Sequence, residues 1–169
     1  MKRDIKTKNQ EIIDYCFSRV DECSLSVDAA EAHERCWRCG CVAQLERCHI
    51  IPDSLGGEDA PSNLVLLCHR CHIENPNVTD PEIMWDWIRA YSTPLYDTFW
   101  LLQGLKEYET IYGRSFEEEL KKRKIEDEER FKILFQEEMK KTTYHYGHPY
   151  LNSATIAGII RIALKKYVD

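Results

Sequence analysis

Two Cys-x-x-Cys pairs constrain this chain more than any other feature of its sequence. They are Cys36/Cys39 and Cys68/Cys71, and 28 residues separate them. Each pair presents two thiolates from one tight turn, and four thiolates suit a tetrahedral Zn²⁺ with bonds of about 2.3 Å. This spacing is longer than in a usual zinc ribbon. The sequence therefore predicts a structural Zn²⁺ that closes the base of a large inserted loop.

The composition favours zinc over disulfides for these cysteines. The chain has eight cysteines, but MKRDIKTKNQ has no apolar segment after its basic residues and does not resemble a secretory signal. We therefore expect a cytoplasmic protein whose paired thiols bind metal. No apolar run approaches the about 18 residues of a membrane span. The remaining thiols, Cys16, Cys23, Cys41 and Cys48, lie outside the two pairs, and we expect the first three to be packed in the fold.

The loop between the cysteine pairs carries the residues that suggest chemistry. His49 precedes an Ile-Ile-Pro turn, Gly56 and Gly57 follow, and Asn63 begins an Asn-Leu-x-x-Leu segment that leads to the second pair and to His72. With both cysteine pairs, this order of residues resembles the HNH endonuclease family. The resemblance is clear over residues 36–72 and continues more weakly to residue 87. It implies a ββα-metal fold that hydrolyses phosphodiester bonds with one divalent cation.

The resemblance also implies roles for three residues. The family's general base precedes the Ile-Ile-Pro turn, and His49 matches it; an imidazole titrates near neutrality and can accept a proton from water. Asn63 matches the middle position, where a side-chain amide holds the loop and so orients the base. His72 matches a ligand of the catalytic metal.

Cys48 departs from the family pattern, in which an Asp or His before the general base often coordinates the catalytic metal. A thiol is a poor ligand for Mg²⁺, which prefers oxygen. Three alternatives remain open at this stage. Glu46, on the same strand face, supplies a carboxylate; water fills the position; or Cys48 selects a softer ion such as Zn²⁺, Co²⁺ or Ni²⁺. We expect Mg²⁺ or Mn²⁺, with a softer ion as the alternative.

The charge balance limits how the chain binds nucleic acid. Its net charge of −6 argues against a protein that coats DNA through overall positive charge. Affinity must come from local groups, and the candidates near the predicted site are Arg38, Arg47, His69 and Arg70. We therefore expect DNA as the partner, bound modestly and in a salt-sensitive way.

The sequence predicts an α+β fold that is mostly α. We expect an N-terminal helical segment at 1–35, a compact zinc-bound ββα-metal core at 36–92 and a helical extension at 93–169. Two helices are expected at residues 9–20 and 27–34, and three more should start near residues 68, 80 and 93. One long charged helix should begin at Ser115, and Ser153 should cap the last helix. Strands are expected at 42–48 and 64–67.

The long charged helix leaves the function of the C-terminal part open. Five acid-before-base pairs four residues apart favour a solvated helix; the alternative is a spacer or dimerisation arm. The last helix is expected to be a core helix, with a helix-turn-helix as the alternative. The leading hypothesis for the whole chain is a metal-dependent DNA endonuclease, and a homodimer is compatible with it. The alternatives are a catalytically inactive zinc-stabilised nucleic-acid-binding module, or an interaction protein built on the charged C-terminal helices.

Overall fold

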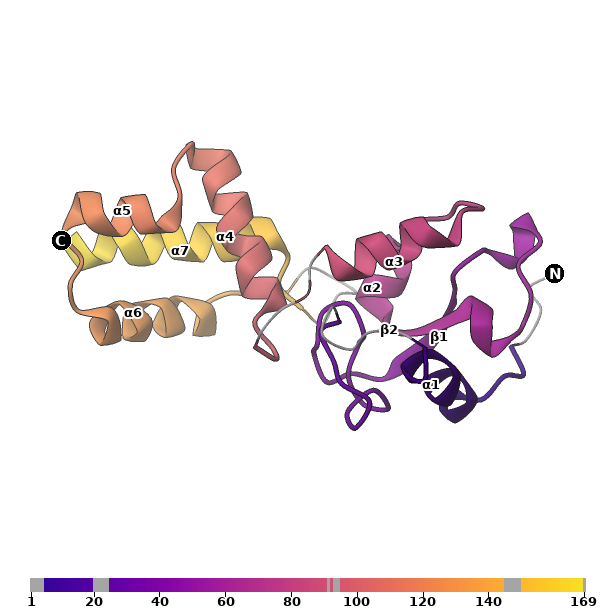
Figure 1. The fold of residues 1–169 in the computed structure, drawn as a ribbon. Helices are drawn as coiled ribbons and strands as arrows, with labels where there is room; N and C mark the ends of the chain where they lie inside the picture. Colours follow the sequence, from indigo (N-terminus) through magenta and orange to yellow (C-terminus); the bar gives the residue numbers. More distant parts are fainter. Residues whose placement is uncertain (1–4, 20–24, 91, 93–94, 145–149, 169) are drawn as a thin grey trace. The chain divides into compact units, whose positions relative to one another are not determined.

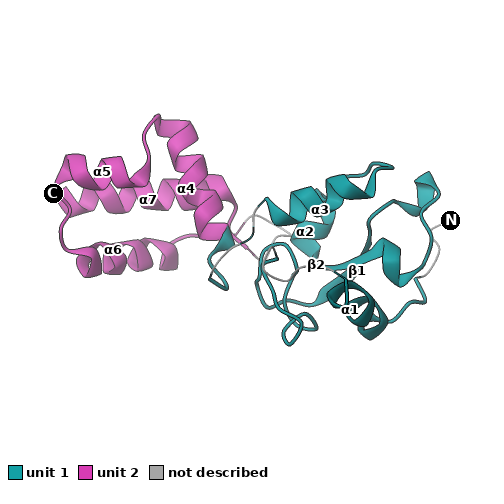
Figure 2. Ribbon diagram, viewed as in Figure 1, with its two compact units in different colours: residues 1–99 teal, residues 100–169 magenta. Residues whose placement is uncertain are grey.

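The computed structural model describes residues 5–19, 25–90, 92, 95–144 and 150–168 (Figure 1). The described residues contain seven α-helices and one two-stranded sheet, which confirms the predicted α+β, mostly α class. The chain divides into two compact units, residues 1–99 and 100–169 (Figure 2). The predicted boundaries at residues 35 and 92 stay a prediction about domain organisation. None of the helices in the described part of the chain combines the length and apolar character that crossing a bilayer requires.

The sheet of the first unit pairs two short antiparallel strands, β1 (Leu45–His49) and β2 (Leu64–Cys68). Residues 64–67 of β2 are all fully buried, as expected for an apolar strand that is covered on both faces. The register places His49 opposite Leu64 and Leu45 opposite Cys68. Two short 3-10 helices, η2 (Asp53–Leu55) and η3 (Pro61–Asn63), lie in the loop between the strands. One end of the sheet therefore carries His49, and the other carries the second cysteine pair.

Two helices contact this sheet, and a third follows them in the first unit. α1 (Asn9–Phe17) packs against β2 and η3 through Ile12, Ile13 and Cys16, and α2 (His69–Glu74) follows β2 directly and contacts both strands. α3 (Pro81–Arg89) begins where predicted, because the Asp80 carboxylate accepts a hydrogen bond from the Glu82 N–H at 3.0 Å. Cys16 is a buried free thiol, as predicted, and burial raises its pKa to about 11. Cys23 lies outside the described residues.

Two predictions for the first unit were wrong in part. The first helix ends at Phe17 rather than near residue 20. Residues 29–34 form turns instead of the second helix expected at 27–34. The Asp28 carboxylate accepts hydrogen bonds from the N–H groups of Ala30 and Glu31 at 3.0 and 3.2 Å. Such a local side-chain bond offers the backbone an alternative to a helix.

The second unit is helical and has its own core. It contains α4 (Phe99–Tyr112), α5 (Phe116–Arg123), α6 (Glu128–Lys140) and α7 (Ser153–Val168). α7 provides most of the core, through Ile156, Ala157, Ile160 and Leu164, and packs against Tyr108 of α4. Gly104 permits this close approach, because a Cβ there would lie 2.2 Å from Ile156 Cγ2. This burial favours the core-helix interpretation of α7.

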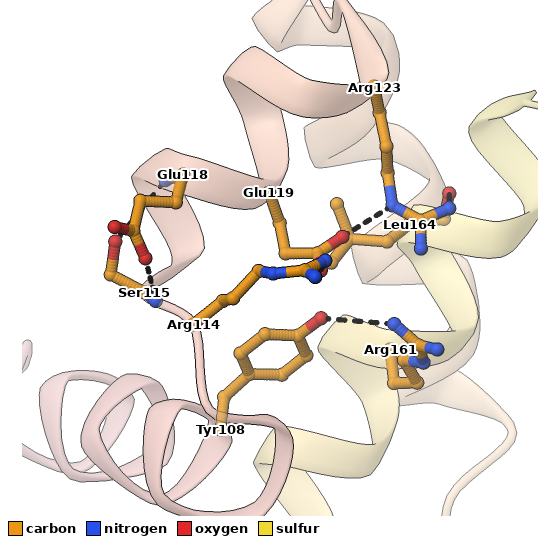
Figure 3. Close-up of polar contacts among 8 residues, drawn as sticks. All are labelled: Tyr108, Arg114, Ser115, Glu118, Glu119, Arg123, Arg161 and Leu164. Carbon is orange, nitrogen blue, oxygen red and sulfur yellow. Dashed lines mark hydrogen bonds and ion pairs between the residues drawn. The ribbon is translucent and has the colours of Figure 1, made fainter.

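The predicted long charged helix is two helices. The Ser115–Glu118 capping box that starts α5 is present, with bonds of 2.9 and 3.2 Å (Figure 3). The helix then ends at Lys124, which has a left-handed conformation with φ of 53°. Asp127 starts α6, since its carboxylate accepts a bond from the Arg130 N–H at 2.9 Å. Similarly, Asn152 caps α7 through the Thr155 N–H, in place of the predicted Ser153.

The predicted ion pairs change with this break. Within the described residues, Glu119–Arg123 is the one predicted pair that lies within ion-pair distance, at 2.7 Å. The Glu119 side chain is only 4% exposed and also meets Arg114 at 3.4 Å (Figure 3). The hydrogen bond from Arg123 lowers the pKa of the Glu119 carboxyl. Arg123 donates a further bond to the Leu164 carbonyl, so this part of α5 packs on α7 and is not a fully solvated face.

Candidate metal centre and catalytic cleft

The four predicted zinc ligands form one cluster in the first unit. The sulfur atoms of Cys36, Cys39, Cys68 and Cys71 all lie within 4.8 Å of one another, and Cys39 Sγ is 3.9 Å from Cys68 Sγ. A tetrahedral site with Zn–S bonds of about 2.3 Å has S···S edges of about 3.8 Å. The cluster therefore fits a zinc ion. Cys41 stays outside it, as predicted, and its thiol donates to the Cys39 carbonyl at 3.6 Å.

The backbone explains why these cysteines converge. The first pair sits on a tight turn in which the Gly40 N–H donates to the Cys36 carbonyl at 2.8 Å, and Gly40 has a positive φ of 67°. The Trp37 N–H donates to the Leu66 carbonyl at 3.1 Å and ties this turn to β2. Cys68 ends β2, and Cys71 lies in the first turn of α2.

Arg38 supports the cysteine cluster from within the fold. Its guanidinium donates to Cys71 Sγ at 3.7 Å and to Glu74 at 2.7 Å. It also lies 4.0 Å from the centre of the Trp87 ring. The residue is 6% exposed, and Arg70 is 8% exposed. This burial argues against direct contacts of Arg38 and Arg70 with nucleic acid, and the predicted roles of both residues stay predictions.

A cleft of about 870 Å³ opens beside β1, α2 and the loop after His49. The predicted site residues that line it come from different segments of the first unit, and they are Glu46, Arg47, Cys48, His49, His69 and His72. The other lining residues are Ile5, Leu45, Pro52, Asp53, Ser54, Asn75 and Asn77. The structure thus brings the predicted base and the predicted metal ligands to one cleft.

Glu46 joins the two histidines of α2. Its Oε2 lies 2.6 Å from His72 Nδ1, and its Oε1 lies 2.9 Å from His69 Nδ1. Burial acts to raise the pKa of the Glu46 carboxyl, but the hydrogen bonds with His72 and His69 outweigh it and lower that pKa. A carboxylate on Nδ1 fixes the ring and leaves Nε2 as the atom for another ligand. The contact with His69 was not predicted, although the three-residue spacing of His69 and His72 places both on one helix face.

Cys48 is poorly suited to bind a cation. It is 1% exposed, its thiol donates to the His49 carbonyl at 3.7 Å, and burial raises its pKa to about 12. The buried Cys48 thiol thus bonds to the neighbouring backbone, whereas the Glu46 carboxylate contacts both cleft histidines. Among the three sequence-based alternatives, this geometry favours Glu46.

Asn63 holds the loop that follows His49. Its Oδ1 accepts the Ile51 N–H at 2.8 Å, and its Nδ2 donates to the carbonyls of Ile51 and Glu58, both at 3.0 Å. The backbone at Gly57 passes close to the backbone at Ile51, because a Cβ on Gly57 would lie 1.7 Å from the Ile51 oxygen. The side-chain amide therefore connects both sides of the loop directly after the predicted base.

Comparison with protein families supports the resemblance that the sequence suggested. Residues 36–87 match the model of a family described as HNH endonuclease. The match begins at the first cysteine pair and ends within α3, so it includes all four clustered cysteines, His49, Asn63 and His72. Comparisons with curated proteins and with solved structures gave no match. The resemblance to HNH endonucleases is confirmed for this segment, and it supports a nuclease-type activity.

Proposed function

We propose that this protein is a metal-dependent endonuclease that hydrolyses phosphodiester bonds in DNA. The observation that carries the proposal is the shared cleft, in which His49 and the Glu46–His72 pair lie together within the segment that matches the HNH endonucleases. The neighbouring cysteine cluster would hold a structural zinc ion that stabilises this segment.

His49 is the proposed general base. In hydrolysis, a water oxygen attacks phosphorus, the bond from phosphorus to the leaving oxygen breaks, and the water proton moves to the imidazole. His49 ends β1, where its backbone pairs with Leu64. The Ile50 N–H donates to the Asn63 carbonyl at 2.9 Å, and the Asn63 amide holds the next residue. These bonds restrict the backbone that carries the base, which is the condition for a positioned proton acceptor.

His72 and Glu46 are the proposed residues for a catalytic divalent cation. Their nitrogen and oxygen donors fit Mn²⁺ and other transition ions, and the carboxylate fits Mg²⁺. When bound, the cation would supply positive charge to the scissile phosphate and the leaving oxygen. Glu46 either binds the cation directly or orients His72 through Nδ1. His69, whose side chain is 70% exposed, remains a candidate phosphate contact.

A zinc-stabilised nucleic-acid-binding module without catalysis is the second candidate. Cys48 favours it, because this buried thiol stands where family members often carry a metal ligand. The net charge of −6 does not favour it, because a module that only binds DNA depends more heavily on positive charge.

Cleavage of supercoiled plasmid tests the proposal. Wild type, His49→Ala and His33→Ala would be screened with Mg²⁺, Mn²⁺, Co²⁺, Ni²⁺ and Zn²⁺ at low salt. His33 is an exposed histidine outside the cleft and serves as the matched control. We expect His49→Ala to lose at least about 100-fold in rate, the usual contribution of a general base, while His33→Ala cleaves as wild type does.

Cation binding and DNA binding, measured together with cleavage, separate the alternatives. Glu46→Gln and His72→Ala should each weaken binding of the catalytic cation, measured by calorimetry on zinc-loaded protein, with a loss of about 10–100-fold for a residue that orients a ligand. Equal cleavage by wild type and His49→Ala would exclude the proposed base. Folded, zinc-loaded wild type that binds DNA but cleaves with no cation would support the binding module instead.

A further inference from the structure

A short segment before α1 lies at the rim of the cleft, and its backbone is fixed there. We call residues 5–8 the N-terminal strap. Ile5 is one of the cleft-lining residues. The Asp59 carboxylate accepts hydrogen bonds from the N–H groups of Lys6 and Thr7 at 2.6 and 3.3 Å. Arg47 Nη1 donates to the Thr7 carbonyl at 3.0 Å. Two charged side chains therefore hold the backbone of an exposed segment.

Both anchors belong to elements that also position the proposed base. Arg47 lies on β1, two residues before His49. Asp59 lies in the loop between η2 and η3, next to Glu58, whose carbonyl accepts a bond from the Asn63 amide. The strap is thus fixed relative to the cleft by the same strand and loop that hold His49. The guanidinium of Arg47, a predicted DNA contact, is engaged with the strap.

The charge of the strap differs from that of the unit around it. Residues 1–99 contain 10 basic and 17 acidic side chains, whereas residues 5–8 contain two basic side chains and no acidic one. The remainder of the unit therefore has eight basic against seventeen acidic residues, and of these eight Arg38 and Arg70 are buried. Lys6 and Lys8 are exposed. Among the described residues, neither ammonium group pairs with a carboxylate.

We propose that the N-terminal strap is a phosphate-binding element, in which Lys6 and Lys8 contact the DNA backbone beside the cleft while Asp59 and Arg47 hold the strap in position. The partner class, DNA, rests on the proposed function. Lysine contacts to phosphates fix the position of a duplex and carry no sequence information. The strap would thus supply local positive charge to a nuclease unit that is acidic overall.

Binding of a short labelled duplex tests this inference, measured by fluorescence anisotropy across a range of salt concentrations. All variants would be made in full-length His49→Ala protein, so that binding is measured without cleavage. We expect the Lys6→Gln/Lys8→Gln double variant to bind about 10-fold more weakly at low salt. The slope of log affinity against log salt should fall by about 2, the value for two lost phosphate contacts. The matched control is Lys121→Gln/Lys122→Gln, which removes two exposed lysines from α5 and should leave the slope unchanged.

Asp59 provides the sharper test, because two effects of its removal oppose each other. Loss of a negative charge alone should strengthen DNA binding, and Glu58→Ala, the neighbouring control, should show this modest gain. Asp59→Ala should instead weaken binding several-fold, because the strap loses two of its three anchoring hydrogen bonds. Zinc content and thermal melting would confirm that each variant is folded. If Asp59→Ala does not fold, the Lys6→Gln/Lys8→Gln variant still tests the inference.

Three results would overturn the inference: an unchanged salt slope for the strap double variant, binding by Asp59→Ala as tight as by Glu58→Ala, or no DNA binding by the parent protein. The plasmid assay reports separately on the proposed function. A protein that binds DNA through the strap but never cleaves would refute the nuclease and keep the strap. A protein that cleaves DNA, but whose salt slope is unchanged in the strap double variant, would support the nuclease and refute the strap.

Discussion

Asn63 shows how one side chain maintains the geometry of the proposed site. Its three hydrogen bonds join Ile51 and Glu58 across the loop after His49. Asn63→Ala would leave a donor and two acceptors unpaired in a partly buried crossing, at a cost of about 1–3 kcal/mol for each fully desolvated group. We expect the free energy of unfolding to fall by about 2 kcal/mol and cleavage to slow with it.

Urea unfolding and plasmid cleavage would measure these two effects. Gln44→Ala is the control, since it removes an exposed amide from the residue just before β1. Asn63→Asp would keep the acceptor for the Ile51 N–H but lose both donors, and should be no better than Asn63→Ala. An Asn63→Ala protein with the stability and rate of wild type would contradict the positioning role.

The sequence predicted individual residues of the candidate site better than the contacts between them. His49, Asn63 and His72 were predicted from their order within the motif, and the cleft contains His49 and His72. The bonds from Glu46 to His69 and His72 depend on the β1–β2 register and on where α2 begins, which the spacing alone did not fix. The burial of Arg38, a candidate nucleic-acid contact in the sequence, was not predicted, because the Trp87 that covers it comes from α3, far along the chain.

At the level of the elements, two predicted caps were confirmed, whereas the cap of α7 was placed one residue late and one helix break was missed. The Ser115–Glu118 and Asp80–Pro81 signals each mark a helix start through local bonding, and both helices start there. The break at Lys124 was missed because the acid-before-base pattern continues across it, and this pattern fits one long helix as well as two. Asp127 was the available signal, since Asp is a favoured N-cap residue.

Lys124 makes the break testable. A non-glycine residue in the left-handed region costs about 1–2 kcal/mol. Glycine avoids this cost, but its greater freedom in the unfolded chain offsets part of the gain in stability. We expect Lys124→Gly to raise the free energy of unfolding by about 0.5–1 kcal/mol in urea denaturation. Lys122→Gly, inside α5, should lower it by about 1 kcal/mol, because glycine is unfavourable within a helix. Equal destabilisation by both would indicate one continuous helix in solution.

At the scale of the whole molecule, the two units should differ in their dependence on zinc. The cysteine cluster lies entirely in residues 1–99, whereas the core of residues 100–169 consists of helical side chains such as Tyr108, Ile160 and Leu164. Structural zinc contributes its binding free energy directly to folding. We therefore expect zinc removal, by a chelator or by Cys36→Ser, to unfold the first unit and leave the second folded.

Hydrogen exchange followed by mass spectrometry would resolve the two units. Without zinc, amides in β1, β2 and α2 should lose protection, while those in α6 and α7 should keep it, because buried apolar contacts maintain the second core. Cys16→Ala removes a buried thiol outside the cluster and should retain a full zinc content and protection in β2. Protection retained in β2 of zinc-free protein would show that the cluster does not stabilise the fold. Simultaneous loss of protection in α7 would show that the two units unfold together, and the second core would then depend on the first.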